Sequence, residues 1–336
     1  MSAPRRRARL APALLPALLA LALAVAGCGG DDRAGGDRGV EVVATTPVVG
    51  GAAASVRQLL APNRDPHDFE PRPGDALAVA RARLVLASGQ GLDGWIEDVV
   101  GQAGGDARLV AVGDGLGRAG DGGDHGPGDA DHGHDDGAAH GDAAHGHDHG
   151  GGDPHWWHDP TNAIAAVRRI AAALTAADPA NRRAYARNAA AYVRRLRALD
   201  AGIRRCIAAI PPARRTLATG HDTLGAFARR YGLAVVGTVI PARTTQAQAS
   251  AGDVAALART LRREGVRAVF AEAGANRKLP EAVAREAGAT VHALHVDGLG
   301  PADGPAGTYL GMMARNADAI VRGLTDGARG CRIAGR

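Results

Sequence analysis

The stretch that decides the fold runs from Pro179 to Ile210 and reads PANRRAYARNAAAYVRRLRALDAGIRRCIAAI. Its apolar side chains recur at steps of three and four, at Tyr185, Ala189, Tyr192, Leu196, Leu199, Ile203, Cys206 and Ile210. This spacing predicts one long amphipathic helix, and Pro211 and Pro212 end it. At 1.5 Å per residue the helix would be about 45 Å long. We therefore expect residues 179–210 to run behind two lobes and link them.

Short apolar strands alternate with helical segments before this helix. The predicted strands are Gly39–Pro47, Leu84–Ala87 and Ala107–Val112, and the predicted helices are Ala52–Leu60, Asp75–Ala82, Leu92–Val100 and Asn162–Ala177. The alternation favours a parallel sheet. Residues 40–178 are therefore expected to form an N-terminal α/β lobe.

The same alternation returns after the helix, in residues 211–336. The predicted strands are Thr216–Thr219, Ala234–Val239, Ala268–Ala271 and Thr290–Val296; the predicted helices are Thr223–Tyr231, Asp253–Glu264 capped by Ser250, Pro280–Ala287 and Thr308–Leu324. Gly288 stands just past a helix end, as is usual. The predicted fold class is α/β, with two parallel-sheet lobes joined by one backbone helix.

Residues 1–27 have the pattern of an export signal. Four arginines precede an apolar run, Leu10–Ala26, that is too short and too often interrupted by proline to span a bilayer comfortably. The run ends at Val25-Ala-Gly-Cys28, which resembles the bacterial lipobox and makes Cys28 the expected lipid attachment site, with residues 28–39 as a flexible tether. An ordinary signal peptide with an incidental cysteine is the alternative. The expected location is the outer face of the cytoplasmic membrane.

Removing the signal also removes most of the net positive charge. The formal charge of +5 includes four arginines of the signal, which leaves 5 − 4 = +1 for the rest of the chain. The charge therefore gives no reason to expect a nucleic-acid partner. An exported chain permits Cys206 and Cys331 to pair, although both could instead be small buried hydrophobic residues.

Residues 119–152 interrupt the first lobe with Gly, Asp, Ala and His. Seven of the chain's thirteen histidines lie here: His125, His132, His134, His140, His145, His147 and His149. Such a composition cannot bury enough apolar area to fold, so we predict a disordered insertion. Weak auxiliary metal binding is the functional interpretation, and a tolerated solubilising loop is the alternative.

Several side chains that can bind metal follow predicted strands or lie in loops. In open parallel sheets, ligands bind beyond the carboxyl ends of the strands. His221, Glu272 and Asp297 each follow a strand of the second lobe, whereas His67 and His155 lie in loops of the first lobe. A cleft between the lobes is therefore their predicted meeting point.

Three motifs carry a resemblance to a known family. They are Asp65-Pro-His-Asp-Phe-Glu-Pro71, Asp153-Pro-His-Trp-Trp-His-Asp-Pro160 and Gly220-His-Asp-Thr-Leu-Gly-Ala-Phe-Ala-Arg-Arg-Tyr-Gly-Leu233, followed by Phe270-Ala-Glu272 and His295-Val-Asp-Gly-Leu-Gly300. Together they resemble the zinc and manganese solute-binding lipoproteins of ABC importers, the ZnuA/TroA/AztC-like group of cluster A-I. The resemblance covers nearly all of the chain after the signal, in the family's order and with a His-rich insertion between the first two motifs.

The resemblance implies that His67, His155, His221 and Asp297 bind the transported metal. Three imidazoles and one carboxylate suit tetrahedral Zn²⁺, whereas a manganese site would hold more oxygen. Manganese receptors of this family tend to have a carboxylate in place of His221, so zinc is expected and Mn²⁺ is the alternative. The implied partner is an ABC permease, and the chain is expected to be a monomer.

Each candidate has a plainer interpretation. A single loop histidine is usually solvated or hydrogen-bonded, and an Asp after a strand, such as Asp297, is often a cap or turn residue. Glu272 is expected to hydrogen-bond a ligand rather than bind metal itself. His158 departs from the family pattern, in which an apolar residue is usual, and we expect it to face away from the metal. His292 and His295 are predicted to be structural.

Two functions from other classes compete with the receptor. A zinc-dependent hydrolase would need an open metal position for water and a general base, and the predicted function is not enzymatic. A His-rich extracytoplasmic zinc buffer or metallochaperone would depend on residues 119–152 instead of the cleft.

Overall fold

The computed structural model describes residues 40–46, 48, 56–62, 64–117 and 153–333, all within the compact unit Gly39–Arg336. These residues contain two four-stranded sheets, ordered β2-β1-β3-β4 and β6-β5-β7-β8, and every strand pair is parallel. The predicted α/β class with two parallel-sheet lobes is confirmed. The predicted signal, Cys28, the tether and the seven histidines of the insertion lie outside the described residues.

The first sheet places its two faces against different helices. Its strands are β1 (Val42–Ala44), β2 (Val56–Gln58), β3 (Leu84–Ala87) and β4 (Arg108–Ala111); its helices are α2 (Pro73–Arg81), α3 (Trp95–Ala103) and α4 (Pro160–Ala177). Val43 and Val85 pack with residues of α2 and α3, whereas Val42 and Leu84 pack on the side of α4. This alternation follows from the two-residue period of a strand, and both faces of the sheet are therefore covered.

The second sheet repeats the arrangement. Its strands are β5 (Thr216–Thr219), β6 (Ala234–Thr238), β7 (Ala268–Glu272) and β8 (Thr290–Leu294); its helices are α6 (Gly225–Tyr231), α7 (Ala251–Arg263), α8 (Lys278–Ala287) and α9 (Tyr309–Leu324). Ala218 and Val269 pack toward α7 and α8, and Leu217 and Phe270 pack into the core shared with α6 and α9. The carboxyl ends of these strands carry the loops that form the site.

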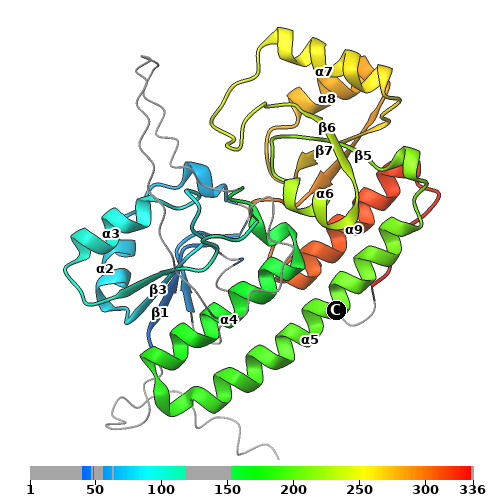
Figure 1. Ribbon diagram of the computed structural model, residues 1–336. Helices are drawn as coiled ribbons and strands as arrows, with labels where there is room; N and C mark the ends of the chain where they lie inside the picture. Colours follow the sequence, from blue (N-terminus) through cyan, green and yellow to red (C-terminus); the bar gives the residue numbers. More distant parts are fainter. Residues whose placement is uncertain (1–39, 47, 49–55, 63, 118–152, 334–336) are drawn as a thin grey trace, which may run out of the picture. The chain divides into compact units, whose positions relative to one another are not determined.

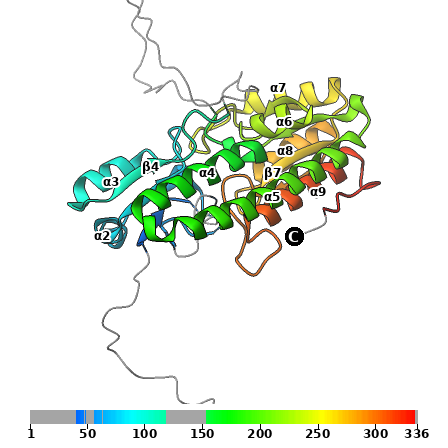
Figure 2. The ribbon, with the colours of Figure 1, turned by 60° about the horizontal axis from the view of Figure 1, so that its bottom comes forward.

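The long helix predicted from the opening stretch is α5 (Arg182–Ala208), preceded by the short helical turn η3 (Pro179–Asn181). It packs against α4 of the first lobe and against α6 and α9 of the second. Figures 1 and 2 both show α4 and α5 side by side, with α9 next to α5. One apolar face therefore serves both lobes, and the opposite face is exposed.

The prediction of a helix over Ala52–Leu60 is wrong for its second half. Val56–Gln58 form strand β2, which pairs in parallel with β1 in the register Val42 to Val56. The apolar spacing of Val56, Leu59 and Leu60 fits a helix, but pairing along the free edge of β1 overrides this local preference. Residues 49–55 lie outside the described part.

Two helix ends match their predicted signals, since Ser250 caps α7 with its side chain and Gly288 ends α8 at a left-handed φ of 71°. Helix α4 begins at Pro160 rather than at Asn162, because the Asp159 side chain caps it. Helix α8 begins at Lys278 rather than at Pro280. No helix in the described ranges is both long enough and apolar enough to cross a bilayer.

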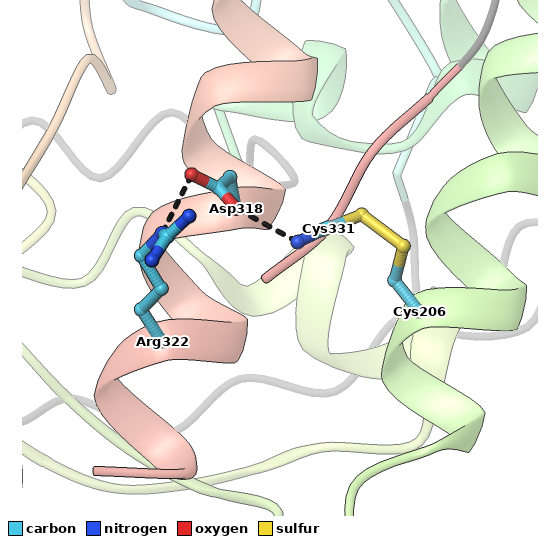
Figure 3. The surroundings of a disulfide bond; sticks show 4 residues. All are labelled: Cys206, Asp318, Arg322 and Cys331. Atoms are coloured by element: carbon cyan, nitrogen blue, oxygen red, sulfur yellow. Dashed lines mark hydrogen bonds and ion pairs between the residues drawn. A yellow bond between two sulfur atoms is a disulfide. The ribbon is translucent and has the colours of Figure 1, made fainter. Parts of the chain in front are cut away.

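A disulfide joins Cys206 of α5 to Cys331, which follows α9, with 5.5 Å between the two Cα atoms (Figure 3). Asp318 of α9 accepts a hydrogen bond of 2.7 Å from the Cys331 backbone N–H. The same carboxylate pairs with Arg322 at 2.9 Å. The segment at Cys331 is therefore held on both α5 and α9.

The carbonyl of Val296, just after β8, joins the two lobes. It accepts hydrogen bonds from Trp157 Nε1 at 2.9 Å and from His158 Nε2 at 3.0 Å, and Tyr309 Oη donates to the Trp157 carbonyl at 2.7 Å. Burial lowers the pKa of His158 to about 4, so its ring is neutral and can donate from Nε2. We call this set of three bonds the Val296 clasp.

We predict that the two donors to the Val296 carbonyl, Trp157 and His158, are coupled. His158→Leu alone should change the free energy of unfolding by less than about 1 kcal/mol, because Trp157 still pairs the carbonyl. In a Trp157→Phe background the same change should cost about 1–3 kcal/mol, because the buried carbonyl then lacks a donor. Urea unfolding of the four proteins in a double-mutant cycle measures the difference. Additive costs would contradict the clasp.

Candidate metal centre

Four predicted side chains converge where the carboxyl ends of the two sheets meet. One ligand atom from each of His67, His155, His221 and Asp297 lies within 4.8 Å of every other. The imidazole centroids are 5.4–5.8 Å apart. No other group of this kind occurs among the described residues.

The atoms that face one another have no hydrogen-bond partner. His67 Nε2, His155 Nε2, His221 Nε2 and both oxygens of Asp297 are buried and unpaired. Asp297 Oδ1 lies 3.4 Å from His155 Nε2, and Asp297 Oδ2 lies 3.2 Å from His221 Nε2. A buried polar atom without a partner costs about 1–3 kcal/mol, so five together in one place point to a ligand with strong affinity for nitrogen and oxygen. A divalent cation meets that requirement.

His155 is held in the orientation that a metal ligand needs. The side chain of Asp153 accepts from the His155 backbone N–H and from its Nδ1, both at 3.0 Å. Because Nδ1 carries the donated proton, the lone pair of Nε2 is left for a cation. Both side chains are nearly or fully buried.

His67 lies in a turn that the second lobe holds. Asp65 accepts from the His67 backbone N–H at 2.8 Å, as the cap of the short helical turn η1 (Pro66–Asp68). From the loop after β6, Thr245 donates to Asp65 at 2.5 Å and Gln246 donates to the His67 carbonyl at 2.6 Å. These bonds lie at or near the surface, unlike those that hold His155.

His221 and Asp297 follow strands of the second sheet. His221 comes two residues after β5, and its carbonyl accepts from Thr219 Oγ1 at 2.8 Å. Asp297 directly follows Val296, whose carbonyl is held by the Val296 clasp. The Asp297 side chain is fully buried. The sheet edge and the clasp therefore set both positions.

The charges favour a cation between the histidines. Burial alone would raise the pKa of Asp297, but the adjoining His221 and the charges of the other two histidines outweigh it and lower the pKa to about 2. Asp297 is therefore an anion at any physiological pH. Burial lowers the pKa of His67, which favours the neutral form that binds metal. For His155, burial is outweighed by Asp153 and Asp297, and the pKa is raised.

Glu272 lies on the wall of a neighbouring cavity and not among the four converging side chains. The cavity has a volume of about 580 Å³ and is lined by Asp65, Asp68, His221 and Glu272, among others. Burial and the charges of Asp297 and Asp65 raise the pKa of Glu272 to about 9, so it is mostly protonated at neutral pH. The expected hydrogen bond from Glu272 to a ligand is absent from the described contacts.

The remaining candidate histidines have structural partners. His158 donates to Val296, His292 packs against Phe270, and the backbone of His295 pairs with Asn316. None of the three lies within the group of four.

Sequence reasoning missed the residues that orient the histidines, although a signal was present. Asp-Pro-His occurs twice, as residues 65–67 and 153–155, and in both copies the Asp side chain accepts from the His backbone N–H. Asp is typical of such turns because its side chain can bond the backbone two residues later. Thr245 and Gln246 had no comparable local signal.

The chain is similar over most of its length to known metal-binding proteins. Residues 42–323 match the family described as zinc-uptake complex component A, periplasmic. The chain is 30% identical over 330 residues to the manganese-binding lipoprotein MntA of Bacillus subtilis, covering 93% of this chain and 98% of MntA. It is 29% identical over 277 residues to the iron-binding protein YfeA of Yersinia pestis, covering 82% and 81% of the two chains.

Among solved structures, the periplasmic zinc binding protein TroA from Treponema pallidum superposes with a TM-score of 0.71 at 27% identity, covering 85% of this chain and 99% of TroA. The names of these three relatives specify manganese, iron and zinc, so the likeness does not by itself select a metal. The matched range contains both sheets and all four converging side chains. The chain belongs to the family of periplasmic zinc-uptake component A proteins.

Proposed function

We propose that this protein is an extracytoplasmic receptor that binds Zn²⁺ with His67, His155, His221 and Asp297 and delivers it to an ABC importer permease. The observation that carries the proposal is the convergence of five buried, unpaired nitrogen and oxygen atoms from these side chains. The family and the metal-binding names of its relatives support a receptor. The lipid anchor at Cys28 is part of the proposal and rests on the sequence motif.

Zinc is proposed over manganese because of the donor set. Three imidazole nitrogens and one carboxylate match the tetrahedral shell of Zn²⁺, whereas Mn²⁺ prefers more oxygen donors. Manganese is the second candidate because MntA, a manganese-binding lipoprotein, is 30% identical. A hydrolase is disfavoured because four protein ligands leave no position for an activated water.

In the proposed cycle, the bound ion joins the two lobes. The ion enters without its hydration shell, displaces protons from the imidazoles and bridges His67 and His155 of the first lobe to His221 and Asp297 of the second. Because α5 and the Val296 clasp join the lobes, closure is a small movement. The His-rich residues 119–152 are proposed to collect zinc weakly and not to be required for the tight site.

Loss of a ligand should remove tight binding. His155→Ala and His221→Ala should each lower zinc affinity at least about 100-fold, because a tetrahedral site loses one of four donors. His292→Ala is the matched control, since it removes a histidine packed on Phe270 outside the site. Titration calorimetry measures the affinities, and unchanged binding by His221→Ala would refute the ligand set. Zinc-dependent hydrolytic turnover would refute the receptor.

Acid should weaken binding. Metal binds the deprotonated imidazole, and the raised pKa of His155 means that this histidine holds a proton at a higher pH than usual. As pH falls, a proton on His155 and then one on His67, whose pKa is lowered, compete with zinc, so affinity should drop by about tenfold or more per pH unit below neutrality. Asp297, with its pKa of about 2, should not contribute. Chelator competition from pH 7.5 to about pH 5 measures this, and a flat profile would contradict it.

His221→Glu should move selectivity toward manganese. The change replaces a nitrogen donor by carboxylate oxygen, and we expect the ratio of manganese to zinc affinity to rise at least about tenfold. His221→Ala serves as the control, because it should weaken both metals without adding oxygen. A ratio that stays constant in a zinc–manganese competition experiment would show that His221 does not set the metal.

A further inference from the structure

The exposed surface of α5 is rich in arginine. The helix contains eight exposed arginines, at positions 182, 183, 187, 194, 195, 197, 204 and 205. Its single acidic residue, Asp200, is half-buried and pairs with Arg230 at 2.6 Å. The helix therefore carries a formal charge of 8 − 1 = +7.

Helical geometry gathers most of these arginines into one stripe. At 3.6 residues per turn, an arc of about 100° contains ten residues of α5. Six are arginines, at 183, 187, 194, 197, 204 and 205, and the other four are exposed alanines, at 186, 190, 201 and 208. We call these six arginines the α5 stripe; from Arg183 to Arg205 it is about 33 Å long.

Among the residues that the structure describes, little neutralises the α5 stripe. Arg204 lies 3.8 Å from Asp200, with half of its side chain exposed. The other five arginines make no ion pair or hydrogen bond with any residue that the structure describes. Five unpaired arginines on one face are therefore not explained by contacts with the residues that the structure describes.

The charge is also segregated along the chain. The chain without its N-terminal signal has a formal charge of +1, so everything outside α5 sums to 1 − 7 = −6. The whole molecule is nearly neutral, and general basicity does not account for the stripe. A chain of this kind presents a local positive potential on one helix face.

The chemistry of the α5 stripe fits a flat array of phosphates. Arginine forks bind phosphate oxygens in pairs, and the intervening alanines leave nothing bulky in the way. A protein partner would need a buried apolar or aromatic centre, and the ten residues of this arc include neither. Single-stranded nucleic acid would need aromatic side chains for stacking, which are also absent from the arc.

We propose that the α5 stripe binds the anionic phospholipid headgroups of a membrane surface. Each basic residue near an anionic bilayer contributes an attraction that falls off within a Debye length. Six of them in a line would hold the molecule along α5, independently of the metal site and of any lipid on Cys28. This surface attachment does not depend on the proposed zinc transport.

Vesicle binding tests the proposal. Exported protein carrying Cys28→Ser, which removes the expected acylation site, is sedimented with phosphatidylcholine vesicles that contain or lack phosphatidylglycerol. The stripe variant combines Arg187→Gln, Arg194→Gln, Arg197→Gln and Arg205→Gln. The matched control combines Arg259→Gln, Arg262→Gln, Arg263→Gln and Arg285→Gln, which remove the same charge from exposed sites of α7 and α8.

The protein with all its arginines should bind vesicles that contain phosphatidylglycerol more tightly than vesicles that lack it, and this binding should weaken as the salt concentration rises. The stripe variant should bind them at least about tenfold more weakly, and the control should not. Zinc affinity should be the same in all three proteins, which also verifies folding. The proposal would be overturned if both variants lost vesicle binding equally, or if the protein did not prefer the anionic vesicles. It would also be overturned if duplex DNA, at equimolar phosphate, displaced the protein from the vesicles.

Discussion

The arrangement of the molecule depends on one costly feature, a set of five buried nitrogen and oxygen atoms without partners at the meeting point of the two sheets. Placing them there requires strands that end at the same edge, turns that aim the imidazoles inward and a carboxylate that stays ionised although it is buried. A site of this kind is unfavourable in the absence of a cation and strongly favourable with one. The unfavourable free energy of desolvating these atoms is therefore relieved when a cation binds, and this relief contributes to the affinity for the cation.

The four converging side chains are not held equally firmly. His155 is fixed by a buried aspartate, and Asp297 follows a carbonyl with two buried donors. His67 depends on bonds near the surface from Thr245 and Gln246. Local unfolding occurs most readily in the weakly buried parts of a structure. Opening of the His67 turn should therefore require the least free energy, and the other three side chains would keep their positions while it opens.

Periodicity and motif order in the sequence were sufficient to predict the two lobes, the long helix and the convergence of the four side chains. They were insufficient for β2, because an edge strand of three residues has too little sequence to outweigh a helical spacing. Asp153 could have been found from the repeated Asp-Pro-His. The roles of Thr245, Gln246 and the two donors to Val296 could not have been predicted. Each of these residues bonds to one more than 130 positions away, and the neighbouring sequence contains no sign of that contact.

The bond between Cys206 and Cys331 closes a span of 125 residues that includes the whole second sheet. A cross-link over such a distance restricts the unfolded chain far more than the folded one. It can form only when almost the entire polypeptide is present in an oxidising compartment. In a reducing compartment both thiols would stay free, and the unfolded second lobe would lack this constraint.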